Sequence, residues 1–327
     1  MTVLYSVREF LRRFFARFSG VLTICGRFLL AVFAFLFINR EIGVSPIFTN
    51  LFVVLIFALI ASITSTKVMV MLASVIILGN AYAIGYDILG LTALIMLLLL
   101  LVFVWFVPDD AVETILMPLA LAVGVPALIP IICGLKRNPA SSAAMVPGVI
   151  MHYYITTLGA NIPQLRSMEL SEFLGRLRII SEAFLGNRMM VMDSLAVVAV
   201  VVIVYAIRKL DADYSFEIAV AAGAVMYVVM ALLGNYALDL GLSVGTVVLS
   251  ALISAAVAFI FLFFVFRVDY SRSENLTFED DDYYYYVKAI PKAVFSEEDM
   301  QARAARRQKG KGAEESGGTA EGDGGTL

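Results

Sequence analysis

The stretch "ILGLTALIMLLLLLVFVWFVP", residues 88–108, decides the class of fold because it contains no charged side chain. A helix needs about 20 apolar residues to cross the hydrocarbon core of a bilayer, and this stretch is long enough. The whole chain has the same character, since 61% of its 327 residues are hydrophobic, 16% are charged and the mean hydropathy is +0.90. These values exclude the two soluble domains that such a length would otherwise suggest. We therefore expect an all-α polytopic membrane protein.

Nine apolar runs of the sequence are long enough to be crossings. They occupy 20–38, 48–65, 68–86, 90–107, 113–134, 140–158, 190–207, 216–235 and 245–266. If all nine crossed from a cytoplasmic N-terminus, the C-terminal tail and two basic pairs in short loops, Lys136–Arg137 and Arg208–Lys209, would lie outside. Basic residues in short loops belong on the cytoplasmic side. One run therefore fails to cross, and about eight transmembrane helices remain.

The run "ETILMPLALAVGVPALIPIICG" at 113–134 is the one that we expect not to cross. It carries Pro118, Gly124, Pro126 and Pro130. Because proline removes a backbone donor and glycine allows a sharp reversal, we predict a proline-broken re-entrant hairpin that returns to the same side. Irregular backbone at membrane depth must be buried in protein or line a water-filled cavity. If instead the run at 20–38, which Arg27 interrupts, did not cross, the tail would also lie in the cytoplasm, but Lys67 would then lie outside.

The N-terminal residues 1–19 predict a basic amphipathic helix that lies in the membrane interface. The sequence "YSVREFLRRFFARF" (5–18) places phenylalanines on one helical face and arginines largely around the other. This pattern is typical of a helix on an anionic leaflet. We expect a multi-pass protein of the cell membrane with a helical domain at 20–266, an anionic cytoplasmic leaflet as its lipid partner, and both termini cytoplasmic.

The longest predicted loop, 159–189, falls on the outer side of this topology. Its segment 168–187 predicts an amphipathic helix along the outer surface, with apolar residues from Leu170 to Phe184 on one face. The mixed charges of the segment, Arg176 and Glu182 among them, are typical of a solvated face. A lid over a substrate pathway is the alternative interpretation.

The tail contains "LTFEDDDYYYYVKAIPK" at 276–292, in which two β-prone runs flank four acids. We predict a cytoplasmic β-hairpin within 267–295, followed at 296–327 by a short helix and a disordered end. An isolated hairpin is only marginally stable. It should therefore pack on the membrane domain, join the sheet edge of a partner protein, or dimerise. The residues that we expect to dock are Phe278, Tyr283, Tyr284, Tyr285 and Tyr286.

Signatures of chemistry are absent from the sequence, so we expect no enzyme, no cofactor and no metal site. There is no phosphate loop, no GxSxG motif and no pair of metal-binding histidines. The only histidine is His152, and Cys25 and Cys133 sit in apolar runs without CxxC spacing. No basic stripe with interleaved aromatic residues indicates nucleic acid.

Several residues could form a transport pathway. The candidates are Arg27, Glu113, Pro126, Pro130, Ser141, Ser142 and His152. Broken helices beside small polar residues are how transporters build midplane sites, although tight helix packing uses the same residues. Arg27 either pairs with an acid such as Glu113 or snorkels to the interface, and His152 is either a proton relay or a neutral imidazole bonded to a backbone carbonyl. Asp87 and Asp193 lie near segment ends, where a charge needs no special account.

The tail motif also carries a resemblance. The string "FEDDDYYYYVKAIPK", which follows a last hydrophobic helix ending in "FRVDYSR", resembles the C-terminal end of a group of uncharacterised polytopic membrane proteins of anaerobic Gram-positive bacteria. That group shares a FEDD-YYYYVKA-PK cytoplasmic tail and a "PDDA" sequence, here Pro108–Ala111, before a proline-broken run. The resemblance covers about half of the chain. It implies a membrane location and this fold, and it implies no activity.

Two functions of different classes fit these observations. The broken run and His152 favour a permease-like transport component whose tail docks a cytoplasmic partner. The lack of a clear ion or substrate site favours the alternative, a non-transporting membrane scaffold or cell-envelope assembly protein. An enzyme that acts on lipid-linked substrates ranks third, because the available acids have no recognisable arrangement.

Overall fold

The computed structural model describes residues 14, 17–106, 112–169, 172–210, 212, 214–265, 274–279 and 284–289. The chain divides into two compact units, 20–263 and a unit made of both ends, 1–19 with 264–327. We describe each unit by itself. Most of the predicted interfacial helix at 1–19 and all of the predicted segment at 296–327 lie outside the described residues.

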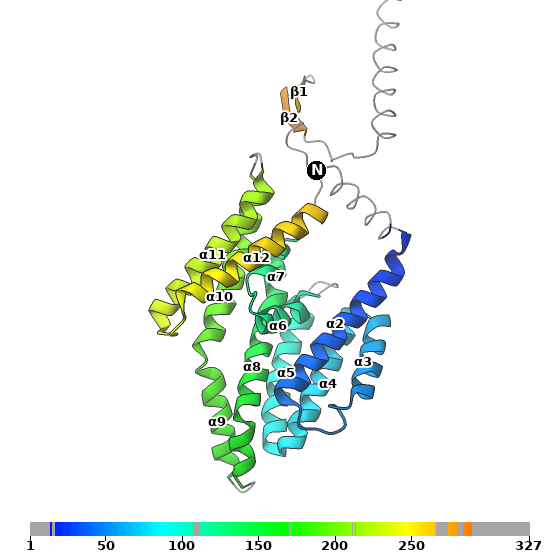
Figure 1. The fold of residues 1–327 in the computed structure, drawn as a ribbon, viewed down its shortest axis with the longest axis vertical. Helices are drawn as coiled ribbons and strands as arrows, with labels where there is room; N and C mark the ends of the chain where they lie inside the picture. The colour runs from blue at the N-terminus through cyan, green and yellow to red at the C-terminus, as the bar shows by residue number, and fades with distance from the viewer. Residues whose placement is uncertain are drawn as a thin grey trace, which may run out of the picture. The chain divides into compact units, whose positions relative to one another are not determined.

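The unit at 20–263 is a bundle of α-helices (Figure 1). In chain order these are α2 (Ser19–Ile42), α3 (Leu51–Ile63), α4 (Thr66–Ile84), α5 (Tyr86–Phe106), α6 (Glu113–Val123), α7 (Leu128–Lys136), the 3₁₀ turn η1 (Pro139–Ser141), α8 (Ser142–Ser167), α9 (Phe173–Leu185), α10 (Arg188–Arg208), α11 (Ser215–Leu238) and α12 (Val244–Val265). Among the described residues, five segments are long and apolar enough to cross a membrane: α2, α4, Phe173–Arg208, α11 and Val244–Phe264. They fit a multi-pass membrane protein.

The predicted loop at 159–189 is shorter than the sequence indicates, because α8 continues to Ser167. The apolar run ends near 158, but tertiary contacts carry the helix further. Leu165 is 1% exposed, and Gly159 lies against the carbonyl of Glu41, where a Cβ atom would be 2.3 Å from the oxygen. Packing against α2 therefore extends α8 beyond its hydrophobic segment, and the loop helix α9 begins at Phe173.

Polar side chains tie neighbouring helices together at one end of the bundle. Asn80, fully buried near the end of α4, accepts hydrogen bonds of 2.9 Å from the N–H groups of Val44 and Ser45, in the loop after α2. Arg188 at the start of α10 donates to the carbonyl of Leu238 at the end of α11, at 2.7 Å. The bonds to Asn80 fix the loop after α2, and the bond from Arg188 satisfies a carbonyl at the end of α11 that lacks a partner within the helix.

The segment at 113–136 forms two short helices, α6 and α7, joined by a tight turn (Figure 1). Gly124 adopts a φ of +82°, and the N–H of Val125 donates to the carbonyl of Ala120 at 2.9 Å. This geometry is a Schellman motif, which ends a helix on a left-handed glycine. The turn therefore reverses the chain where the sequence places its breakers.

Close backbone approaches hold this hairpin in the bundle. A Cβ atom on Gly148 of α8 would lie 2.6 Å from the carbonyl oxygen of Thr114, so α8 and α6 meet almost backbone to backbone. Val204 of α10 packs against Gly134 of α7 and Gly223 of α11, where added Cβ atoms would lie 2.7 Å and 2.5 Å from its side chain. Small residues at such contacts are typical of helix packing in membranes.

Two strands belong to the unit made of the chain ends. β1 (Glu274–Glu279) and β2 (Tyr284–Ala289) pair antiparallel. The register sets Phe278 opposite Tyr285 and Thr277 opposite Tyr286. Of the residues that we expect to dock a partner, Tyr283 lies outside the described residues, and the others occupy positions in this ladder.

Candidate functional site

An ion pair joins the two ends of the α6–α7 hairpin. Glu113 in the first turn of α6 forms an ion pair with Arg137, directly after α7, with Oε1 and Nε 3.0 Å apart. Arg208 at the end of α10 donates to the carbonyls of Leu135 and Arg137, the latter at 3.1 Å. The chain therefore leaves the hairpin where it entered, beside the end of α10.

Glu113 is one alternative partner that the sequence suggests for Arg27, and this pairing does not occur. Arg27 of α2 instead donates to the carbonyl of Thr64 at 3.2 Å, at the end of α3. The physical reason is that the last carbonyls of a helix lack partners within it, whereas the Glu113 carboxylate already has the guanidinium of Arg137. Arg27 thus ties α2 to α3.

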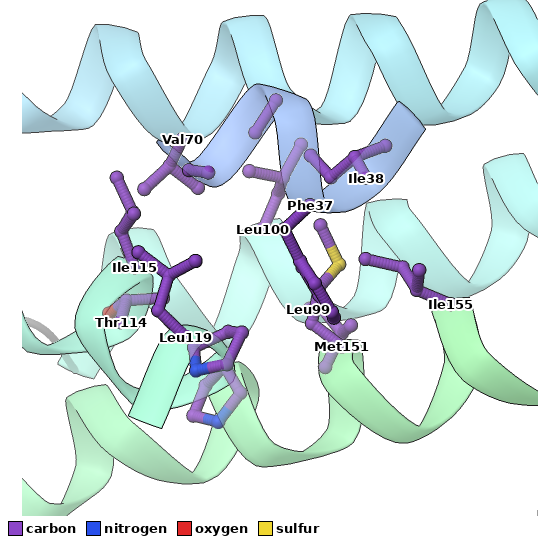
Figure 2. Close-up of a pocket in the computed structure, with 14 residues that line it drawn as sticks. Phe37, Ile38, Val70, Leu99, Leu100, Thr114, Ile115, Leu119, Met151 and Ile155 are labelled. Atoms are coloured by element: carbon purple, nitrogen blue, oxygen red, sulfur yellow. The ribbon is translucent and has the colours of Figure 1, made fainter. Parts of the chain in front are cut away.

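An apolar cavity of about 60 Å³ lies inside the bundle, beside the hairpin. Its wall comes from α2, α4, α5, α6 and α8, and Figure 2 shows the side chains converging on it. The lining residues are Ala34, Phe37, Ile38, Val70, Ala73, Leu99, Leu100, Thr114, Ile115, Pro118, Leu119, Pro147, Met151 and Ile155.

The side chains that line the cavity are almost entirely apolar. Thr114 contributes the one hydroxyl of the lining, and this hydroxyl already donates to the carbonyl of Ala144 at 2.7 Å. Nothing in this wall could replace the water shell of an ion. The cavity can therefore accept an apolar group such as part of an acyl chain.

His152 lies next to this cavity without being part of its lining. Its ring stacks on Phe37 of α2, with the ring centres 5.6 Å apart and an angle of 3° between the planes. Its Nδ1 atom is buried and has no hydrogen-bond partner among the described residues. His152 thus packs against α2 through its ring.

The structure does not gather the predicted pathway residues around one site. Pro126 is buried in the turn, and Pro130 is buried in the first turn of α7, where the missing N–H costs no helical bond. Ser142 donates to the carbonyl of Pro139 at 2.7 Å, a local bond, and Ser141 ends the 3₁₀ turn. None of the described pathway candidates lines the cavity, which is formed by other residues of α2, α6 and α8 together with residues of α4 and α5.

Arg176 is a buried residue that the sequence misplaces on a solvated face. It is 1% exposed, and its Nε lies 3.1 Å from Oδ2 of Asp87, which is 7% exposed. Its Nη2 also donates to the carbonyl of Ile84 at 3.1 Å. The buried stripe of α9 is Arg176, Ile180 and Phe184, whereas Phe173 and Leu174 are exposed. The i, i+4, i+8 spacing of this stripe was a signal, but a charge at its head conceals it.

Asp193 is the second buried acid that the sequence does not single out. It lies on α10, is 4% exposed and accepts a hydrogen bond of 2.5 Å from the hydroxyl of Tyr153 on α8. In the sequence Asp193 lies near the end of an apolar segment, where a charge needs no special account. The burial arises because α8 and α11 both pack on α10, and α8 reaches Asp193 through Tyr153.

Among the described residues, no group of three histidine, cysteine, aspartate or glutamate side chains stands close enough to hold a metal ion. Comparisons with protein-family models, with curated proteins and with solved structures find no match.

Proposed function

We propose that the chain is a permease-like transport component in which the α6–α7 hairpin and α8 line a pathway. The observation that carries the proposal is the Glu113–Arg137 ion pair, which closes the hairpin at one end of the bundle. Val123, at the tip, is ten residues from Glu113, or about 15 Å along a helix, which is half of a 30 Å hydrocarbon core. Hairpins that stop at mid-membrane are typical of transport pathways.

The proposed topology has eight crossings, with both termini in the cytoplasm. Ion pairs and hydrogen bonds support it, because Arg208 meets the end of α7, and the basic residues Lys136, Arg137, Arg208 and Lys209 thus gather at one end. A single face that collects short basic loops is the cytoplasmic face. The crossing helices would be α2, α3, α4, α5, α8, α10, α11 and α12. The shortest of them is α3, whose 13 residues give about 20 Å of helix, less than the predicted run at 48–65.

The tail would dock a cytoplasmic protein partner through Phe278 and the tyrosines at 283–286. Support comes from the described ladder, which pairs two strands, so that each strand has one edge that no other described strand occupies. Affinity capture of the intact protein in detergent, compared with a variant that lacks residues 276–292, tests this part. Recovery of the same partners from both proteins would contradict it.

Reactivity of a cysteine at the hairpin tip tests the pathway. In a chain whose Cys25 and Cys133 are replaced by alanine, we would place a cysteine at Val123, which is 77% exposed. A thiol must ionise in water before it reacts with a charged, membrane-impermeant maleimide. We expect Val123→Cys to react from one side of the membrane.

The matched control is Leu252→Cys on α12, which is 62% exposed at a similar distance from its helix end. It should face lipid and stay unreactive. If both cysteines are unreactive, the tip is sealed from water and the pathway proposal is wrong. That result would favour the alternative, a membrane scaffold or cell-envelope assembly protein, since packing alone would then account for the hairpin.

A further inference from the structure

Two aspartates are buried in the bundle, and their surroundings differ. Asp87 faces the guanidinium of Arg176 at 3.1 Å, so its negative charge is compensated. Asp193 makes no ion pair among the residues that the structure describes. Oxygen Oδ2 of Asp193 accepts from Tyr153, and oxygen Oδ1 is buried without a hydrogen-bond partner within the described part of the chain.

The groups that face Asp193 from the packed helices are weak acids or apolar. From α8 comes Tyr153, and from α11 comes Tyr227, which is 8% exposed and within electrostatic range of the carboxyl. Cys133 of α7 is buried in the same apolar cluster as Tyr153, but α7 meets α10 at its Arg208 end rather than at Asp193. The neighbouring turn η1 has no ionisable side chain.

The nearest cations are directed elsewhere. Arg188, five residues earlier on α10, donates to the carbonyl of Leu238. Lys136 on α7 lies near the end of α10 that holds Arg208, about 22 Å along the helix from Asp193. His152 on α8 stacks on Phe37 of α2. Within the described chain, therefore, no positive group compensates a charge on Asp193.

A carboxylate in this position is costly. Removing an ion from water is unfavourable even after the protein relaxes, and one hydrogen bond does not offset that cost. Binding a proton removes the charge and leaves a neutral group that loses far less on burial. The two other uses of a buried acid, an ion pair and a metal site, are both missing among the described residues here.

We propose that Asp193, with Tyr153 and Tyr227, forms a proton-binding site in the membrane domain. The proton bonds to Oδ1, the oxygen that Tyr153 leaves free, and it comes from water at the Arg188 end of α10, about 7.5 Å away along the helix. Release of the proton to water restores the carboxylate. As a binding site the proposal stands alone, whereas proton coupling of transport rests on the proposed function.

Infrared difference spectra of the purified protein in lipid nanodiscs test the site directly. A protonated carboxyl has a carbonyl stretching band that the carboxylate lacks. Spectra recorded from about pH 8.5 down to about pH 5.5 stay above the range in which ordinary carboxyls titrate. We expect the band to appear in the wild-type protein, to be lost in Asp193→Asn and to persist in Glu182→Gln, which removes an exposed carboxyl on α9.

Tyr153→Phe gives a second readout that does not depend on how well Asp193→Asn folds. Loss of the hydroxyl removes the hydrogen bond to the carboxyl, so the band should shift to higher wavenumber. A band that is absent from the wild-type protein, or present but unchanged in frequency in Tyr153→Phe, would overturn the proposal. The measurement needs no transport activity, so a band together with an unreactive Val123→Cys would support the proton site and reject the pathway.

Discussion

The α6–α7 segment and α8 both carry prolines, yet the first is divided and the second is not. α8 contains Pro147 and Pro163 and runs unbroken over 26 residues. The segment at 113–136 contains three prolines, of which Pro118 lies inside α6 and Pro130 lies inside α7. The chain reverses at Gly124, with its φ of +82°.

This difference shows that glycine, not proline, decides the reversal. A proline inside a helix frees one carbonyl, and a close neighbour can compensate for it. Packing supports α8 beside Pro147, where Gly148 lets the α6 and α8 backbones meet and Thr114 donates to the carbonyl of Ala144, the residue after the Ala143 carbonyl that Pro147 frees. A neighbouring helix cannot compensate for a residue in the left-handed conformation, because that residue turns the chain out of the helix.

The largest expected effect comes from separating the hairpin from α8. In Gly148→Ala the new methyl would lie 2.6 Å from a backbone oxygen that cannot rotate away. We expect a loss of about 2–3 kcal/mol in unfolding free energy, measured by thermal unfolding in detergent. The matched control, Gly90→Ala on α5, has no atom within 4 Å of the added Cβ and should be neutral or stabilising. Equal behaviour of the two variants would refute the close α6–α8 contact.

A smaller effect is expected at the reversal itself. Gly124→Ala meets no neighbouring atom, so its cost is the left-handed backbone alone. That cost is about 1–2 kcal/mol for a residue with a Cβ. The same unfolding measurement should therefore place Gly124→Ala between Gly148→Ala and the wild type. A variant as stable as the wild type would mean that another residue sets the turn.

The ion pair at the hairpin ends should contribute less. The side chains of Glu113 and Arg137 are 14% and 25% exposed, so the pair is only partly shielded from solvent. We expect Glu113→Gln to cost about 1 kcal/mol, with less effect at high salt. The control Glu182→Gln breaks an exposed pair with Arg178 and should change nothing measurable. If Glu113→Gln and the wild type unfold at the same midpoint at low salt, the Glu113–Arg137 ion pair does not hold the two ends of the hairpin together.

The smallest effect is expected in α8, where proline can be removed. Pro163 is exposed, and alanine would restore a backbone donor inside the helix. Pro163→Ala should leave the free energy of unfolding unchanged or raise it by up to about 0.5 kcal/mol. A loss larger than about 1 kcal/mol would show that this proline shapes α8 after all.

Much of the helical fold follows from the sequence because apolar length and charge are local properties. The sequence predicted a membrane helix over the apolar run at 88–108 and a divided segment at 113–134. A helix, α5, lies over the first, and α6 and α7 divide the second. The sequence did not predict features that depend on contacts between distant parts of the chain. Ser167 ends α8 far beyond its apolar run, because α2 supports the extension from a distant part of the chain.

The candidate site was less predictable for the same reason. Arg176 and Asp193 are ordinary loop and segment-end charges in one dimension, and only the packing of α9 on the α4–α5 turn and of α10 on α8 buries them. Conversely, Ser142 looked functional beside the prolines but makes a local turn bond. A pairing across about 90 residues, such as Arg176 with Asp87, leaves no pattern in one sequence.

The most direct test of the account is the side of the membrane on which residue 138 lies. With Cys25 and Cys133 replaced by alanine, Asn138→Cys lies in the exposed loop after α7, and Leu185→Cys, 73% exposed at the end of α9, serves as the control. A hairpin that returns predicts that an impermeant thiol reagent reaches Asn138→Cys only from the cytoplasm and Leu185→Cys only from outside. Labelling of Asn138→Cys from outside would contradict the account, because the segment at 113–136 would then cross the membrane.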